Sequence, residues 1–214
     1  PDSYRTSLSQ NGPRHSWTGL FLGSLWDANL QGIPSTSADG DDLQYQADED
    51  GVVLSGTAAG WNAGNGRISV TSNGPGCLNA WMDFTDDAGS GAGVNSADGN
   101  FTKTGGYDTF STFSEHIVQN VKLNTGTTNF AVTVPSNLFN PTTNNYYLRF
   151  HLSPTSDGTF NGTCNATIAP FGFVTGGEVE DYRFNLNLGS IGNYVWLDED
   201  GDGDQDAGEV GIPN

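Results

Sequence analysis

Basic residues are scarce in this chain of 214 residues, which has 7 Lys and Arg against 25 Asp and Glu and a formal net charge of −18. Such a surface repels nucleic acids and anionic lipids, so we expect no nucleic-acid partner. No stretch is apolar for the length of a membrane span, so we expect no membrane insertion. Pro1 opens directly into polar sequence without a signal peptide, and we therefore expect a mature, processed chain.

Catalytic motifs are missing as well. The chain contains no HExxH, no GxSxG, no P-loop and no GxGxxG pattern. Its three histidines, His15, His116 and His151, are widely separated in the sequence. Paired carboxylates can serve a glycosidase, but in an acid-rich chain such pairs arise by chance, and metal binding explains their spacing better. We therefore predict that the protein is not an enzyme.

Cysteine is limited to Cys77 and Cys164. A single pair in a chain of this composition predicts a disulfide, and hence an oxidising, extracellular compartment. The alternative is that both residues are buried free thiols.

Glycine, by contrast, is frequent at 30 residues, and it accompanies many Asn, Thr and Ser residues, a composition typical of turns and short strands. No segment shows a sustained helical period. We predict an all-β fold, an antiparallel β-sandwich or jelly roll with long loops, followed by a C-terminal strand and calcium loop. The predicted strands of the sandwich are Gly51–Leu54, Arg67–Thr71, Cys77–Phe84, His116–Leu123, Thr128–Val134, Tyr146–Leu152 and Val179–Leu188.

Two of these segments alternate clearly between two faces. In "CLNAWMDF", one face carries Leu78, Ala80, Met82 and Phe84, and the other carries Cys77, Asn79, Trp81 and Asp83. In "NYYLRFHL", Tyr146, Leu148, Phe150 and Leu152 share a face, and Tyr147, Arg149 and His151 share the other. Two Gly- and Ser-rich stretches, 86–106 and 153–177, are predicted long loops. A Gly/Ser break near Leu188 separates a domain of residues 1–188 from a second unit of residues 189–214.

The stretch "DEDGDGDQDAGE" fits a twelve-residue calcium loop that begins at Asp198. Carboxylates fall at positions one, three, five, seven, nine and twelve of this loop, and Gly203 falls at position six, where the turn requires it. Oxygen ligands alone favour calcium over zinc or copper. The predicted ligands are Asp198, Asp200, Asp202, Asp204, Asp206 and Glu209. The alternative is an acidic turn that binds no ion.

The segment "GGEVEDYRF" at 176–184 resembles the signature of the GEVED domain family. Further blocks resemble this family in its order, namely "PDSYRTSLSQNGPRH", "LGSLWDANLQGIPSTSADGDDLQYQADEDGV", "LNAWMDF" and "VPSNLFN…YYLRFHLS", and together they cover nearly all of residues 1–185. The chain departs from the family after Asp83, where a long insertion precedes Glu115 at the position of the family's loop-ending Glu. The last segment resembles the first strand and calcium loop of the B-repeat domains of serine-aspartate-repeat surface adhesins. Both resemblances imply a secreted or surface-attached bacterial protein with a structural or adhesive role.

A second acidic segment, "SADGDDLQYQADEDGV", would repel itself strongly without a cation. We expect a calcium ion here that joins this segment to the core, with Asp83 as a further candidate ligand. The resemblance pairs the segment with Glu178, Glu180 and Asp181. The alternative for Glu180 is an ion pair with Arg149. The candidate ligands in this group are Asp39, Asp41, Asp42, Asp48, Asp50, Asp83, Glu178, Glu180 and Asp181.

Three sequons, at Asn100, Asn161 and Asn165, are candidate glycosylation sites. Four aromatic residues, Trp17, Trp26, Trp61 and Tyr107, either stack on sugars or pack in the core.

Two functions fit these features. The first is a non-catalytic, calcium-stabilised extracellular module of a bacterial surface stalk, adhesin or self-assembling fibre. The second is a carbohydrate-binding accessory module of a secreted hydrolase. The predicted strand at residues 191–197 is apolar on both faces. Either it belongs to a chain cut inside its next domain, or it adds to the sheet of another copy and forms a homopolymer, the alternative that we favour.

Overall fold

The structure is a computed structural model, and it describes residues 6–26, 32–38, 47–55, 61, 66–83, 101, 115–132, 145–154, 162–165 and 168–185. Within these ranges the fold is all-β, as predicted, and helical conformation is limited to the 3-10 turn η2 (Leu8–Gln10) and to Trp61. No helix in this part of the chain is long and apolar enough to cross a membrane. The predicted domain boundary near Leu188 and the strand at 191–197 lie outside the described residues.

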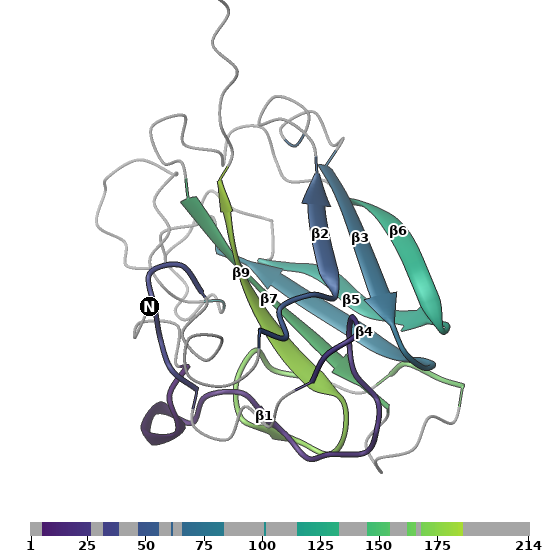
Figure 1. Ribbon diagram of the computed structural model, residues 1–214, viewed down its shortest axis with the longest axis horizontal. Helices are drawn as coiled ribbons and strands as arrows, with labels where there is room; N and C mark the ends of the chain where they lie inside the picture. Colours follow the sequence, from purple (N-terminus) through teal and green to yellow (C-terminus); the bar gives the residue numbers. More distant parts are fainter. Residues whose placement is uncertain are drawn as a thin grey trace, which may run out of the picture.

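Two antiparallel sheets form the body of the fold (Figure 1). The three-stranded sheet has the order β2-β3-β6, with β2 (Val52–Ser55), β3 (Gly66–Ser72) and β6 (Gly126–Val132). The four-stranded sheet has the order β5-β4-β7-β9, with β5 (His116–Leu123), β4 (Gly76–Met82), β7 (Asn145–Ser153) and β9 (Glu178–Asn185). A short parallel pair joins β1 (Arg14–His15) to β8 (Phe173–Val174). The prediction of an antiparallel β-sandwich is therefore confirmed.

All seven predicted strands of the sandwich are present, with ends that shift by one or two residues within the described ranges. The positions predicted beyond β4, β6 and β9, including Phe84, lie outside those ranges. Strands β1 and β8 were not predicted, because two residues are too few to show an alternating pattern.

The hydrophobic core lies between the two sheets. The predicted inner face of the two central strands is confirmed, since the antiparallel register pairs Leu78 with Leu152, Ala80 with Phe150 and Met82 with Leu148. These side chains pack in one cluster with residues of the other sheet, including Ile68 and Val70. Burying such side chains contributes roughly 1.5–3 kcal/mol for each large aliphatic or aromatic residue.

The outer face of the four-stranded sheet is also covered. Every residue of β4 is buried, although alternate residues point away from the core. On this outer face Trp81 and Phe101 form a second, smaller hydrophobic cluster. The N-terminal segment also packs here, because the ring of His15 contacts the ring of His151 on β7. The central strands are therefore buried on both sides.

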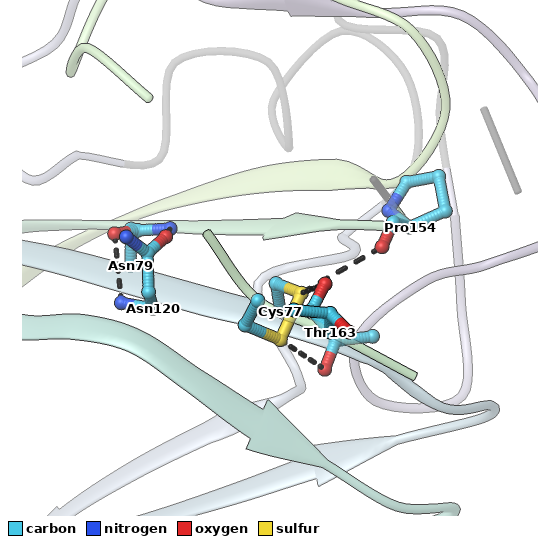
Figure 2. Close-up of a disulfide and its surroundings, with 7 residues drawn as sticks. Cys77, Asn79, Asn120, Pro154 and Thr163 are labelled. Carbon is cyan, nitrogen blue, oxygen red and sulfur yellow. Dashed lines mark hydrogen bonds between the residues drawn. A yellow bond between two sulfur atoms is a disulfide. The ribbon is translucent and has the colours of Figure 1, made fainter. Parts of the chain in front are cut away.

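The predicted disulfide is confirmed (Figure 2). Cys77 and Cys164 are joined by an S–S bond of 2.08 Å, with 5.4 Å between their Cα atoms. The Cys77 sulfur lies 3.6 Å from the Pro154 carbonyl oxygen and 3.7 Å from that of Thr163, and these are contacts rather than hydrogen bonds because a disulfide sulfur carries no proton. The bond attaches the segment around Cys164 to the start of β4.

Loss of this disulfide should destabilise the fold substantially. The two cysteines are 87 residues apart in sequence, and a cross-link of that span restricts the unfolded chain by about 4 kcal/mol in the chain-entropy model. We expect the double variant Cys77→Ser/Cys164→Ser to unfold about 10 °C or more below the wild type in thermal unfolding. A reducing agent should have the same effect on the wild type and none on the variant. Equal melting temperatures with and without reductant would contradict a stabilising role.

Candidate functional site

Two glutamates on the core-facing side of β9 are buried. The register pairs Glu178 with Leu152 and Glu180 with Phe150, so both carboxylates lie on the apolar face of the sheet. Each residue is only 1% exposed. The alternating sequence "EVED" places them there, since residues two apart on a strand share a face.

Backbone N–H groups from two distant segments reach these carboxylates. Oε2 of Glu178 accepts a hydrogen bond of 2.6 Å from the Leu22 N–H, and Oε1 of Glu180 accepts one of 3.1 Å from the Gly51 N–H. The Tyr182 hydroxyl accepts from the Val52 N–H at 3.0 Å and donates to Oε2 of Glu180 at 3.0 Å. The glutamates therefore fix both segments against the end of β9.

Two glycines make this close approach feasible. A Cβ atom on Gly51 would lie against Leu22 and 2.9 Å from Oε1 of Glu180, so a larger residue would push the segment away from the carboxylate. Gly177 has a φ of 86°, and a Cβ there would collide with the Leu152 carbonyl group. Only glycine combines a favourable positive φ with the absence of a Cβ atom, so only glycine fits at position 177.

The charged form of each glutamate is strongly disfavoured here. Burial, followed by the nearby charge of Glu180, raises the pKa of Glu178 to about 10. Burial also raises the pKa of Glu180 to about 8, and its hydrogen bonds from Tyr182 and Gly51 lower it only partly. Burial raises the pKa of the Tyr182 hydroxyl in turn. Without a cation, burial thus favours the protonated form of both carboxyl groups.

Asp48 and Asp50 add to the negative charge at this place. Asp48 is 1% exposed, and the charges of both aspartates contribute to the raised pKa values of Glu178 and Glu180. The carboxylate of Asp50 accepts the Ser24 N–H at 3.0 Å and the Ser24 hydroxyl. We call Asp48, Asp50, Glu178 and Glu180 the acidic cluster. The structure thus brings together the two segments that the family resemblance pairs.

Asp181 lies on the opposite face of β9. Arg149, which is fully buried, donates to its two carboxylate oxygens at 2.7 Å and 2.6 Å. Arg149 also donates to the Pro170 carbonyl group at 2.8 Å. The alternative in which Arg149 pairs with Glu180 is therefore wrong. Because Asp181 neutralises Arg149 on the other face, it is not part of the acidic cluster.

Asp83 and Glu115 lie at the end of β4, where backbone hydrogen bonds hold the chain. The Met82 N–H donates to the Glu115 carbonyl oxygen at 2.9 Å, and the Asp83 N–H donates to that of Tyr147 at 3.0 Å. Both acidic side chains are buried, at 0% and 3% exposure respectively. Glu115 thus lies next to the end of β4, although it is far from Asp83 in sequence.

The remaining predicted site residues are only partly covered. Asp39, Asp41, Asp42 and the loop from Asp198 to Glu209 lie outside the described residues, as do Asn100, Asn161 and Tyr107. Asn165 is described and exposed. Among the residues that the structure does describe, no three His, Cys, Asp or Glu side chains are grouped closely enough to hold a metal ion.

The three histidines, far apart in sequence, gather on the outer face of the four-stranded sheet. The ring centroids of His15 and His151 are 5.1 Å apart, and Trp81 lies 5.3 Å from His151 and stacks on His116 at 4.4 Å. One ring nitrogen of His15, Nδ1, lies 2.9 Å from the Gly176 carbonyl oxygen. Sequence analysis missed this group, because only the pairing of β4 with β5 and β7 and the docking of β1 bring these residues together.

Burial favours the neutral form of these imidazoles. It lowers the pKa of His15 to about 4, only partly opposed by the hydrogen bond to Gly176. Burial lowers the pKa of His151 as well, and the charges of His15, Arg149 and His116 lower it further. His116 is less buried, and its pKa is also lowered mainly by desolvation.

Comparison with known proteins returned no match, whether against family models, curated proteins or solved structures. The resemblance to the GEVED family therefore rests on the sequence blocks quoted above, and function has to be argued from this chain's own residues.

Acid should weaken the docking of the N-terminal segment through His15. Its folded pKa of about 4 lies below the ordinary value of 6.5, so its contribution is present above pH 6.5 and is lost as the pH falls towards 4. The loss amounts to about 3 kcal/mol. We measure the free energy of unfolding of the wild type and of His15→Gln. The wild-type value minus the variant value should fall by this amount between pH 7 and pH 4. Subtraction of the variant removes the titration of the acidic cluster, which both proteins share.

The matched control is His116→Gln, since His116 is about half buried and should show a smaller change over the same range. A pH-independent difference for the His15 variant would contradict the prediction.

Proposed function

We propose that this chain is a non-catalytic extracellular structural module of a bacterial surface stalk, adhesin or self-assembling fibre, and that calcium stabilises it. The proposal joins three features: a largely buried acidic cluster, a disulfide, and a C-terminal acidic loop with calcium-ligand spacing.

The observation that carries the proposal is the burial and incomplete hydrogen bonding of the Glu178 carboxyl group. Its Oε1 atom is buried and has no hydrogen-bond partner within the described part of the chain, while Oε2 accepts one backbone hydrogen bond. A buried polar atom without a partner costs roughly 1–3 kcal/mol, and a buried charge costs more. A divalent cation would offset both costs, because it supplies a partner and neutralises neighbouring carboxylates.

The donor set suits calcium. The acidic cluster offers only carboxylate oxygens, which are the ligands that calcium prefers over softer metals. Members of the acidic cluster, with Glu178 foremost, would supply part of the ligand set. Since fewer than three of the described side chains are close enough to coordinate one ion as they stand, we propose that Asp39, Asp41 or Asp42 completes the ligand set. The bound ion would strengthen the attachment of the segments at Leu22 and Gly51 to β9.

The loop from Asp198 to Glu209 is proposed as a second, independent calcium site on the basis of its sequence spacing. The disulfide supports an extracellular location, because such bonds persist in oxidising compartments. Asn100, Asn161 and Asn165 would be candidate glycosylation sites on such a protein.

Calcium should raise the melting temperature, because an ion that binds only the folded state stabilises it by mass action. We expect excess chelator to lower the melting temperature of the wild type by several degrees. Glu178→Gln is the informative variant, since its amide oxygen can still accept the Leu22 N–H without a charge. In chelator the variant should be at least as stable as the wild type, whereas in calcium it should be less stable.

Asp202→Ala is the control for the second site, and it should remove one bound ion without changing the fold of residues 1–188. Calorimetric titration with calcium separates the two sites by the number of ions lost in each variant. Melting curves of the wild type that are identical in calcium and chelator would overturn the calcium proposal.

Assembly should depend on residues 191–197. An apolar strand with open edges pairs readily with the sheet of a neighbouring copy, which would propagate head to tail into a filament. We expect the full chain to form filaments visible by electron microscopy, and a chain truncated at Gly189 to remain monomeric in analytical ultracentrifugation. Equal assembly by the truncated chain would exclude strand addition, and a monomeric full chain would exclude the fibre.

A further inference from the structure

Three aromatic rings gather on the surface of the N-terminal segment. The ring centroids of Trp17 and Trp26 are 4.1 Å apart, and Trp17 lies 6.2 Å from Phe21 with nearly parallel ring planes. Trp17 is 55% exposed, whereas Phe21 and Trp26 are half-buried. We call these three residues the aromatic platform.

Trp17 differs in exposure from two other tryptophans of this chain, which are buried. Trp61 is fully buried in the core and donates its Nε1–H to the Ser55 carbonyl oxygen at 2.9 Å, and Trp81 is 3% exposed. The core-packing interpretation is therefore confirmed for Trp61 but not for Trp17. Leaving more than half of a tryptophan in water forgoes hydrophobic stabilisation, which commonly marks a binding surface.

The segment that carries the platform is fixed to the sandwich near its middle. The side chain of Asn73 accepts the Phe21 N–H at 2.8 Å and donates to the Gly19 carbonyl oxygen at 2.8 Å. Its backbone N–H also donates to the Phe21 carbonyl oxygen at 3.0 Å.

Both ends of the segment are held as well. Asp50 accepts the backbone N–H of Ser24 at 3.0 Å, and the Ser16 hydroxyl accepts that of Gly176 at 2.9 Å. The backbone that carries the rings is thus held in place before any ligand arrives, which reduces the entropy lost on binding.

We propose that the aromatic platform binds a neutral polysaccharide. A pyranose ring presents a face of C–H groups that stacks on an aromatic ring, and its edge presents hydroxyl groups that need polar partners. Exposed polar residues occur along the same segment and beside it, namely Thr18, Ser24 and Asp50. The net charge of −18 disfavours the other common ligands of exposed tryptophan, which are nucleic acids and anionic lipids. A neutral polysaccharide can stack on the apolar rings, and because it carries no charge, the acidic surface does not repel it.

The test is affinity electrophoresis in gels that contain soluble β-glucan, xylan or mannan, together with pull-down on insoluble cellulose and chitin. We expect the wild type to bind at least one of these five polysaccharides, and Trp17→Ala to weaken that binding by tenfold or more. Phe173→Ala is the matched control, because Phe173 is 62% exposed but lies on β8 rather than on the platform, and it should bind like the wild type.

Two further variants separate stacking from misfolding. Trp17→Tyr keeps an aromatic ring and should retain most of the affinity, whereas Asn73→Ala should weaken binding by loosening the segment while leaving the rings present. Melting temperatures within a few degrees of the wild type establish that the variants fold. Absence of binding to all five polysaccharides would overturn the proposal, as would equal weakening by Trp17→Ala and Phe173→Ala.

Self-association that Trp17→Ala abolishes, in the absence of polysaccharide binding, would also overturn it and assign the platform to contacts between copies. Every assay is run in calcium and in chelator. Binding that persists in chelator distinguishes this site from the proposed calcium function, which can fail independently.

Discussion

The burial of two carboxylates on the core-facing side of β9 is the constraint on which the arrangement of the N-terminal half depends. Glu178 and Glu180 occupy positions that alternation gives to apolar residues, next to Leu152 and Phe150. Groups of this kind persist inside a protein only when hydrogen bonds or charges compensate for lost hydration. The backbone at Leu22 and Gly51 supplies part of that compensation, so these loops are drawn onto the end of the sheet.

On the outer face of the same sheet, the polar residues include an ion pair and a group of histidines. Arg149 is buried there with its charge balanced by Asp181, and its guanidinium carbon lies 5.1 Å from the centre of the Phe101 ring. The histidines and Trp81 fill the neighbouring space beneath the N-terminal segment. Because the charge of Arg149 is balanced and burial favours the uncharged form of the histidines, these polar groups can be buried beside the small hydrophobic cluster of Trp81 and Phe101. The disulfide holds the covering segment near Cys164 in place.

Asp50 links the acidic cluster to the surface. Its charge contributes to the raised pKa of Glu178, and its carboxylate also holds the backbone at Ser24, between the rings of Phe21 and Trp26 in sequence. A structural role for the acidic cluster and a binding role for the aromatic platform are therefore compatible. Asp50 of the cluster fixes the same N-terminal segment that carries the platform. In a surface protein the two would serve rigidity and attachment respectively.

The sequence by itself determined the all-β class, the strands and the two faces of β4 and β7, because alternation of apolar and polar residues is a local property of each strand. It also predicted the disulfide, since only one pair of cysteines was available, and the family resemblance pointed to Glu178 and Glu180 as candidate ligands.

Only the tertiary structure decided which partner each charged residue has. Arg149 bonds Asp181 rather than Glu180, because strand register puts those two acids on opposite faces. The gathering of His15 with His151, and the exposure of Trp17 beside a buried Trp61, likewise depend on contacts between segments far apart in sequence, and no local pattern encodes such contacts.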